Sequence, residues 1–180
     1  MNSSKPIELN AAKLQELKDA IQAAFRVRNE SASKMEAWQE ACRRFHLAYD
    51  ELAFPGGLAK AMLQLQAADP MTIELAVQFL EADPWFFRSG YIKEEVLERI
   101  RWVPLDLDQK RRLQQLILAR VRDPRARREF RRYCRLAPFI TDPEFEKEIV
   151  RVAGPSGTKP KRAQWVLEHL RQGKPKRKKL

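Results

Sequence analysis

The apolar residues of this 180-residue chain recur every three or four positions along most of its length, and this spacing constrains the fold more than any other feature. The clearest run alternates spacings of three and four and comprises Met35, Trp38, Cys42, Phe45, Tyr49 and Leu52. Such a run forms a narrow apolar seam along one side of an α-helix, which packs against another helix. No stretch alternates apolar and polar residues for long enough to predict a β-strand. The sequence therefore predicts an all-α fold.

Two helices are expected at the start of the chain. Asn10 is a favourable N-cap residue, so the first helix is predicted from about residue 11 to Arg28, after a poorly ordered lead-in. Ser33 and Glu36 match a capping box, which predicts the start of the second helix. Because the link between the two helices is short, they are expected to form an antiparallel hairpin.

The segment Phe54-Pro55-Gly56-Gly57 ends this hairpin, since a proline followed by two glycines cannot continue a helix. A predicted helix containing Lys60 follows it, as in a phosphate-binding loop. The segment nevertheless lacks the GxxxxGK[ST] spacing and a preceding strand. We interpret it as a simple turn.

Asp-Pro dipeptides punctuate the rest of the chain, at residues 69–70, 83–84, 123–124 and 142–143. Asp accepts hydrogen bonds from the free N–H groups of a first helical turn, and Pro has no N–H to leave unbonded, so the dipeptide predicts a helix start. Together with the apolar spacing it predicts helices at about 58–67, 70–81, 84–89, 91–102, 107–121, 124–136 and 142–152. A Gly- and Pro-rich linker follows, and one more helix is expected at about 161–172.

Asp83-Pro84 and Asp123-Pro124 are 40 residues apart, close to the length of about 40–47 residues of two-helix solenoid repeats. In this architecture alone, over roughly residues 58–152, the chain resembles HEAT or armadillo proteins. The resemblance implies a short, irregular, right-handed α-solenoid-like stack of helix pairs. The predicted organisation is a helical hairpin over 1–54, a helical-repeat-like core over 55–152 continuous with it, a linker and helix over 153–172, and a flexible basic tail over 173–180.

Positive charge is concentrated in the second half of the chain. Residues 1–98 carry 11 basic and 15 acidic side chains, whereas residues 99–180 carry 24 basic and 9 acidic ones. A segment this basic attracts polyanions, of which nucleic acid is the commonest, followed by acidic proteins and membrane surfaces. The alternative is a solvated charged surface without a ligand.

The helix predicted over residues 124–136 carries the densest arginine cluster. Its outer face is expected to present Arg125, Arg128, Arg132 and Arg135 at helical spacing, with Arg127 and Arg131 beside them. A planar guanidinium can bind phosphate in a bidentate way, so such a run could follow a phosphodiester backbone without reading its sequence. The alternative is a face balanced by ion pairs with the acidic first half.

The candidate anion-binding residues extend to the preceding helix and to the tail. The full set is Lys110, Arg111, Arg112, Arg120, Arg122, Arg125, Arg127, Arg128, Arg131, Arg132, Arg135, Lys174, Lys176, Arg177, Lys178 and Lys179. The tail resembles a nuclear-import signal or a nucleic-acid-contacting arm, and a solubilising tail is an equal alternative. We expect a non-enzymatic module that binds nucleic acid, DNA or RNA; the alternative is a scaffold that docks an acidic protein.

An aromatic cluster precedes the arginines and comprises Trp85, Phe86, Phe87, Tyr91 and Trp102. Exposed aromatic side chains beside basic residues would form a stacking platform for single-stranded bases. Buried ones would form a packing layer between helices. We favour the packing layer, because such side chains bury large apolar areas.

Catalytic and metal-binding motifs are not evident in the sequence. His46 and His169 lie outside any known nucleophile motif, and neither HExxH nor paired CxxC occurs. Glu94, Glu95 and Glu98 are explained by solvation of a helix surface. We therefore expect neither enzymatic activity, nor a cofactor, nor a metal.

The sequence also bears on cellular location. No apolar run approaches the roughly 20 residues of a membrane span, and the N-terminus lacks the apolar core of a signal peptide. We expect a cytoplasmic protein, or a nuclear one if the source is eukaryotic. Cys42 and Cys134 are expected to be buried, reduced thiols, and a disulfide between them is the alternative.

Overall fold

The computed structural model describes residues 5–123, 128–154 and 161–175, and within these ranges it contains helices, turns and no β-strand. The all-α prediction is confirmed. The chain divides into two compact units, Met1–Ile92 (unit 1) and Lys93–Leu180 (unit 2). The domain boundaries predicted at residues 54 and 152 fall inside these units and stay predictions. None of the described helices is both long and apolar enough to cross a membrane.

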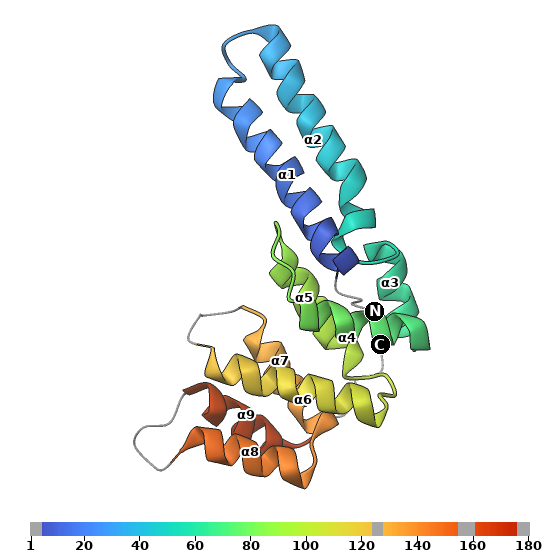
Figure 1. The fold of residues 1–180 in the computed structure, drawn as a ribbon, viewed down its shortest axis with the longest axis vertical. Coiled ribbons are helices and arrows are strands. Elements are labelled where there is room, and N and C mark those ends of the chain that lie inside the picture. Colours follow the sequence, from blue (N-terminus) through green and yellow to red (C-terminus); the bar gives the residue numbers. More distant parts are fainter. Residues whose placement is uncertain (1–4, 124–127, 155–160, 176–180) are drawn as a thin grey trace. The chain divides into compact units, whose positions relative to one another are not determined.

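Unit 1 begins with the predicted hairpin, whose two helices lie against each other along their length (Figure 1). Its helices are α1 (Lys5–Val27), α2 (Ala32–Ala53), α3 (Leu58–Gln66), α4 (Pro70–Ala82) and the first residues of α5 (Ser89–Ile100). Helix α3 packs on α2 and on α4, and α4 also contacts α1. Fully buried residues such as Leu14, Phe54 and Leu80 form the core of the unit.

Both helices of the hairpin begin before their predicted positions. α1 starts at Lys5, so most of the expected lead-in is helical, and its first turns are anchored by the buried Ile7. The N-cap of α2 is Ser31 and not Ser33, because the Ser31 hydroxyl accepts the hydrogen bond from the Lys34 N–H, at 3.2 Å. The predicted capping box at Ser33 was therefore wrong by two residues.

Two of the Asp-Pro dipeptides start helices, as predicted. The Asp69 carboxylate accepts a hydrogen bond from the Thr72 N–H at 2.8 Å and begins α4. The Asp142 carboxylate accepts one from the Phe145 N–H, also at 2.8 Å, and begins α8.

The other two dipeptides end helices, which contradicts the prediction. The backbone N–H of Asp83 donates to the Phe79 carbonyl at the end of α4, and that of Asp123 donates to the Ala119 carbonyl at the end of α6. The helix predicted over residues 84–89 does not form: residues 84–88 are not helical, and Ser89 begins α5. The helix expected from residue 124 begins at Phe130, after a turn at residues 128–129; residues 124–127 lie outside the described ranges. Because proline lacks the N–H that would bond to the preceding helical turn, Asp-Pro is as compatible with a helix end as with a start.

Unit 2 contains the rest of α5 and a cluster of helices in which α6 and α9 each pack on both α7 and α8 (Figure 1). The helices of the cluster are α6 (Leu107–Arg122), α7 (Phe130–Ile140), α8 (Pro143–Ala153) and α9 (Lys161–Gln172). α7 continues through Pro138 beyond its predicted end, because its apolar face extends to the buried Ile140. Leu113, Leu136 and Val166 have no exposed surface and form the core of the cluster.

The aromatic cluster does not form one packing layer. Phe86 is 3% exposed and packs as predicted, but Trp85 is 82% exposed and Tyr91 is 54% exposed. The packing prediction was wrong for these two residues. Trp85 lies in the non-helical segment that replaces the helix expected over 84–89, and Tyr91 lies on the exposed side of α5. Phe87 is also partly exposed, and Trp102 is half-buried and packs on Phe139 within unit 2, with ring centroids 4.9 Å apart.

Candidate functional site

The predicted anion-binding residues that the structure describes all lie in unit 2. Lys110, Arg111, Arg112, Arg120 and Arg122 are on α6, Arg131, Arg132 and Arg135 are on α7, Arg128 is in the turn before α7, and Lys174 follows α9. The remaining candidates, Arg125, Arg127, Lys176, Arg177, Lys178 and Lys179, lie outside the described ranges.

Ion pairs join two of these arginines to α5. Arg128 Nε lies 2.8 Å from Glu94 Oε1, and a terminal nitrogen of Arg132 lies 2.7 Å from Glu98 Oε2. Both carboxylates belong to the acidic first half of the sequence. For Arg128 and Arg132 the structure therefore matches the alternative interpretation, an arginine face balanced by ion pairs. The arginines of α7 are therefore not equivalent, and Arg131 and Arg135 are the exposed ones.

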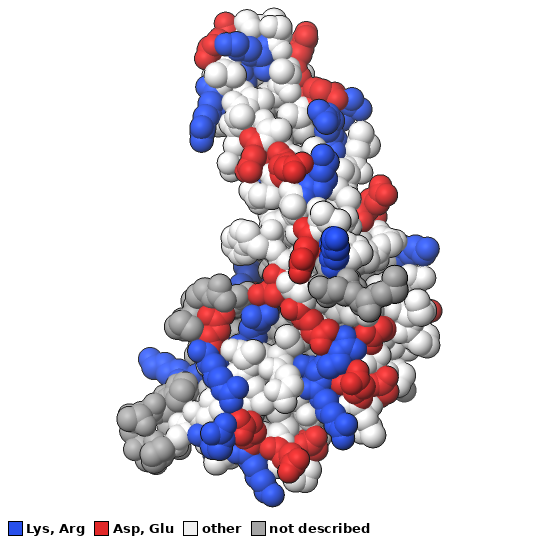
Figure 2. Space-filling model, viewed as in Figure 1, with Lys and Arg blue, Asp and Glu red and all other residues white. Residues whose placement is uncertain are grey.

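Acidic partners are also present on α6 and α8. Arg112 pairs with Asp108 at 3.3 Å, and Arg122 pairs with Glu148 at 2.8 Å. Over the part of the molecule where Figure 1 shows α6–α9, basic and acidic side chains alternate on the face drawn in Figure 2. On this face the basic side chains of unit 2 are thus interspersed with carboxylates and do not form a continuous basic patch.

A local excess of positive charge surrounds Glu98. This carboxylate accepts hydrogen bonds from both Arg101 and Arg132. Burial lowers the pKa of the Arg101 guanidinium, Glu98 opposes this effect, and the nearby Arg135 and Arg132 lower the pKa further by repulsion. Arginine stays charged despite such shifts, so Glu98 pairs with two cations, and a third, Arg135, lies near enough to repel Arg101. We call Arg101, Arg132, Arg135 and Glu98 the arginine cluster.

Aromatic rings flank the arginine cluster. The Arg101 guanidinium carbon lies 5.0 Å from the centre of the Trp102 ring system, which packs edge-on against Phe139. Lys174 Nζ lies 6.0 Å from the Phe139 ring centre on the same aromatic pair. The fold thus brings the start of the basic tail to the rings beside the arginine cluster.

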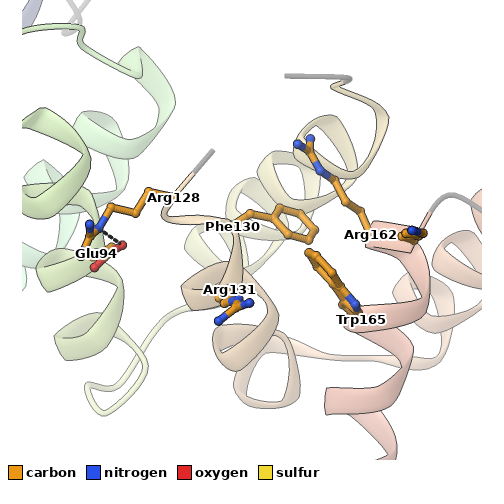
Figure 3. Close-up of a pocket in the computed structure, with 7 residues that line it drawn as sticks. Glu94, Arg128, Phe130, Arg131, Arg162 and Trp165 are labelled. Atoms are coloured by element: carbon orange, nitrogen blue, oxygen red, sulfur yellow. Dashed lines mark hydrogen bonds and ion pairs between the residues drawn. The ribbon is translucent and has the colours of Figure 1, made fainter. Parts of the chain in front are cut away.

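A pocket of about 620 Å³ lies between α7 and α9 (Figure 3). Its lining residues are Glu94, Arg128, Phe130, Arg131, Lys161, Arg162 and Trp165. The rings of Phe130 and Trp165 lie side by side with centroids 6.1 Å apart and planes inclined by 42°. The Arg162 guanidinium lies 5.2 Å from the Phe130 ring centre and donates to the carbonyls of Arg120 and Asp123. The pocket therefore combines an aromatic wall with several cations.

Sequence reasoning did not select Arg101, Arg162 or Trp165. Each of them contacts residues remote in sequence. Arg162, for example, donates hydrogen bonds to backbone carbonyls 39 and 42 positions earlier. A local signal did exist: Arg162 and Trp165 are three residues apart and so share one helix face.

The two cysteines are free thiols, which confirms the reduced state predicted for them. Cys134 is buried, and this burial raises the pKa of its thiol to about 12. Cys42 is only half-buried, contrary to expectation. Among the described residues, no group of three or more His, Cys, Asp or Glu side chains is placed to bind a metal ion.

Comparisons of the chain with protein-family models, with curated proteins and with solved structures gave no match.

Proposed function

We propose that this protein is a non-enzymatic helical module that binds the phosphate backbone of nucleic acid through the arginines of α7 and the basic tail. The observation that carries the proposal is the arginine cluster, in which Glu98 accepts hydrogen bonds from the guanidinium groups of Arg101 and Arg132 and the exposed Arg135 lies nearby. These guanidinium groups have more N–H groups than one carboxylate can bond, and a phosphodiester oxygen can accept hydrogen bonds from the remaining ones. Arg131 and Arg135 are exposed one helical turn apart, so both can reach the same backbone.

The proposal includes the finer architecture and the location of the protein. The pairwise packing of helices supports a short, irregular, solenoid-like stack resembling HEAT repeats. A cytoplasmic location, or a nuclear one in a eukaryote, gives such a module access to nucleic acid.

The test is binding of a labelled oligonucleotide, measured by fluorescence anisotropy. The informative variant is Arg131→Glu with Arg135→Glu, because both side chains are exposed. Arg128 and Arg132 are poorer choices, since a glutamate at either position would face Glu94 or Glu98. We expect the wild type to lose affinity steeply between about 50 and 200 mM salt, and the double variant to bind at least about tenfold more weakly at the lower salt.

A matched control keeps the same change in net charge but places it in unit 1. Arg44→Glu with Lys60→Glu reverses two exposed cations, on α2 and α3. This control should retain most of the wild-type affinity. Equal losses in the two double variants, or no binding of duplex, single strand and structured RNA at low salt, would contradict the proposal.

A scaffold that docks an acidic protein is the second candidate. Its support is that Arg128 and Arg132 already hold carboxylates at 2.8 and 2.7 Å, so this surface fits carboxylate as well as phosphate. Polyglutamate and an oligonucleotide of equal charge separate the two functions in the same assay. Tighter binding of polyglutamate at every salt concentration would favour the scaffold.

A further inference from the structure

The pocket between α7 and α9 has a feature that binding of a phosphate backbone alone does not require, namely its aromatic wall. We propose that this pocket is a nucleotide subsite in which an unpaired base stacks on Trp165 while the adjacent phosphate binds Arg131 and Lys161. The inference rests on the proposed function and narrows it to single-stranded nucleic acid.

The Trp165 ring is a supported platform. It is 41% exposed, and it rests against Phe130, which is only 3% exposed. The Arg162 guanidinium lies against the Phe130 ring and is bonded to two carbonyls at the end of α6. Figure 3 shows the rings of Phe130 and Trp165 beside each other with Arg162 next to Phe130. A ring supported in this way loses little conformational entropy when a base stacks on it.

The charge of the pocket selects an anionic ligand. Its lining includes four cations and one carboxylate, that of Glu94, which is bonded to Arg128 at 2.8 Å. Arg131 and Lys161 are exposed and form no ion pair with any carboxylate that the structure describes. They are thus available for a phosphate, while Arg162 is engaged by carbonyls. An aromatic ring attached to a phosphate matches both halves of this site.

Stacking on Trp165 requires a base with a free face, which excludes a base within a duplex from this pocket. In a duplex both faces of each base are covered by its neighbours, whereas an unpaired base can offer a face to an aromatic side chain. The volume of about 620 Å³ lies in the range of small-ligand pockets, roughly 300–1,000 Å³. The same chemistry could come from a nucleotide within a strand or from a free nucleoside monophosphate, and the experiment below separates these sources.

The test compares an oligothymidylate of about 12 nucleotides with an abasic strand of the same length, which has the same phosphates but no bases. We expect the wild type to bind the abasic strand about tenfold more weakly. Trp165→Ala should weaken binding of oligothymidylate by a similar factor without changing that of the abasic strand. Trp165→Phe, which retains an aromatic face, should keep most of the affinity.

The outcomes separate this inference from the proposed function. Equal affinity of the wild type for the normal and abasic strands overturns the subsite and leaves phosphate binding intact. This comparison needs no variant, so it stays decisive even if Trp165→Ala does not fold. If no strand binds but thymidine monophosphate does, and Trp165→Ala abolishes that binding, the subsite is supported and the proposed function is overturned. Tighter binding of an acidic, tyrosine-containing peptide than of either strand overturns the subsite.

Discussion

The α1–α2 hairpin and the α6–α9 cluster are both built from amphipathic helices, but they bury their apolar stripes to different depths. Beyond Leu14, the hairpin seam includes half-buried residues such as Leu17, Ile21 and Met35. In the cluster, Leu113 and Ile117 have no exposed surface. Each hairpin helix packs mainly on the other and makes only a small contact with α3 or α4, whereas the helices of the cluster pack around one another as a group of four. We therefore expect the cluster to depend more strongly on its core residues than the hairpin does.

The two units also differ in charge. Unit 1 carries 10 basic and 12 acidic side chains, and unit 2 carries 25 basic and 12 acidic ones. The number of acids is the same, so the positive charge of unit 2 comes from added bases and not from missing acids. Those acids remain as partners, as the pairs of Glu94 and Glu98 show. A binding surface in unit 2 is thus defined by the cations that the acids do not neutralise.

The difference in core depth predicts the largest effect of mutation. Leu113→Ala should lower the free energy of unfolding by about 3 kcal/mol, because it opens a cavity in a fully buried site. The same substitution at the half-buried Leu17 should cost about 1 kcal/mol, since less apolar area is involved. Urea unfolding followed by far-UV circular dichroism measures both. Equal losses would show that the hairpin is as tightly packed as the cluster.

The two thiols provide a second comparison between the units. Only the thiolate reacts with a disulfide reagent, and burial raises the pKa of the Cys134 thiol to about 12. Cys42 on α2 is half-buried and should react first. In the native protein we expect Cys134 to react at least about 100-fold more slowly than Cys42. In urea the two thiols should react at the same rate. Cys42→Ser assigns the phases, and a fast phase that survives this substitution would contradict the assignment.

The sequence predicted the helices much better than it predicted their ends or the site. Apolar spacing is a local property, so it located the hairpin and the helices near 58–67, 70–81 and 107–121. Whether an Asp-Pro dipeptide starts or ends a helix depends on which flanking segment is buried, and this is decided by tertiary packing. For that reason Asp83 and Asp123 were predicted to start helices, whereas they end α4 and α6.

The same limit applies to the candidate site. The arginine-rich segment was visible in the sequence, but its charge balance was not. Arg128 and Arg132 meet carboxylates 34 residues away, a distance over which local patterns carry no information. Arg101 was missed because its positive neighbours lie on another helix. Similarly, Lys93 and Glu129 are buried charged residues that no local pattern marks.

The cap of α8 makes a contribution to stability that depends on pH. The pKa of Asp142 is lowered first by the hydrogen bond from the Phe145 N–H and then by that from Gln114 on α6. A lowered pKa in the folded state means that the stabilisation is present above the pKa of the unfolded chain, near 4, and is lost as pH falls through the folded value. Asp142→Ala should cost about 1 kcal/mol at pH 7 and progressively less below pH 4.

Asp69 is the matched position in unit 1. It caps α4 through Thr72 on its own helix, whereas Asp142 also accepts a hydrogen bond from a different helix at 2.9 Å. Asp69→Ala should therefore destabilise the protein less than Asp142→Ala does. Urea midpoints at pH 7 and pH 3 measure both variants, and a larger loss for Asp69→Ala would show that the link to α6 contributes nothing.

The smallest expected effect tests the turn between α3 and α4 in unit 1. Ala68 has a φ of 59°, and the N–H groups of Ala68 and Asp69 donate to the carbonyls of Leu65 and Gln64. This pattern ends helices with a left-handed residue, a position that favours glycine because it has no Cβ. Ala68→Gly should raise the free energy of unfolding by up to about 1 kcal/mol. Ala20→Gly, on the exposed side of α1, should instead lower it by about 1 kcal/mol. If both substitutions destabilise the protein, the entropy that glycine adds to the unfolded chain outweighs the relief of strain at Ala68.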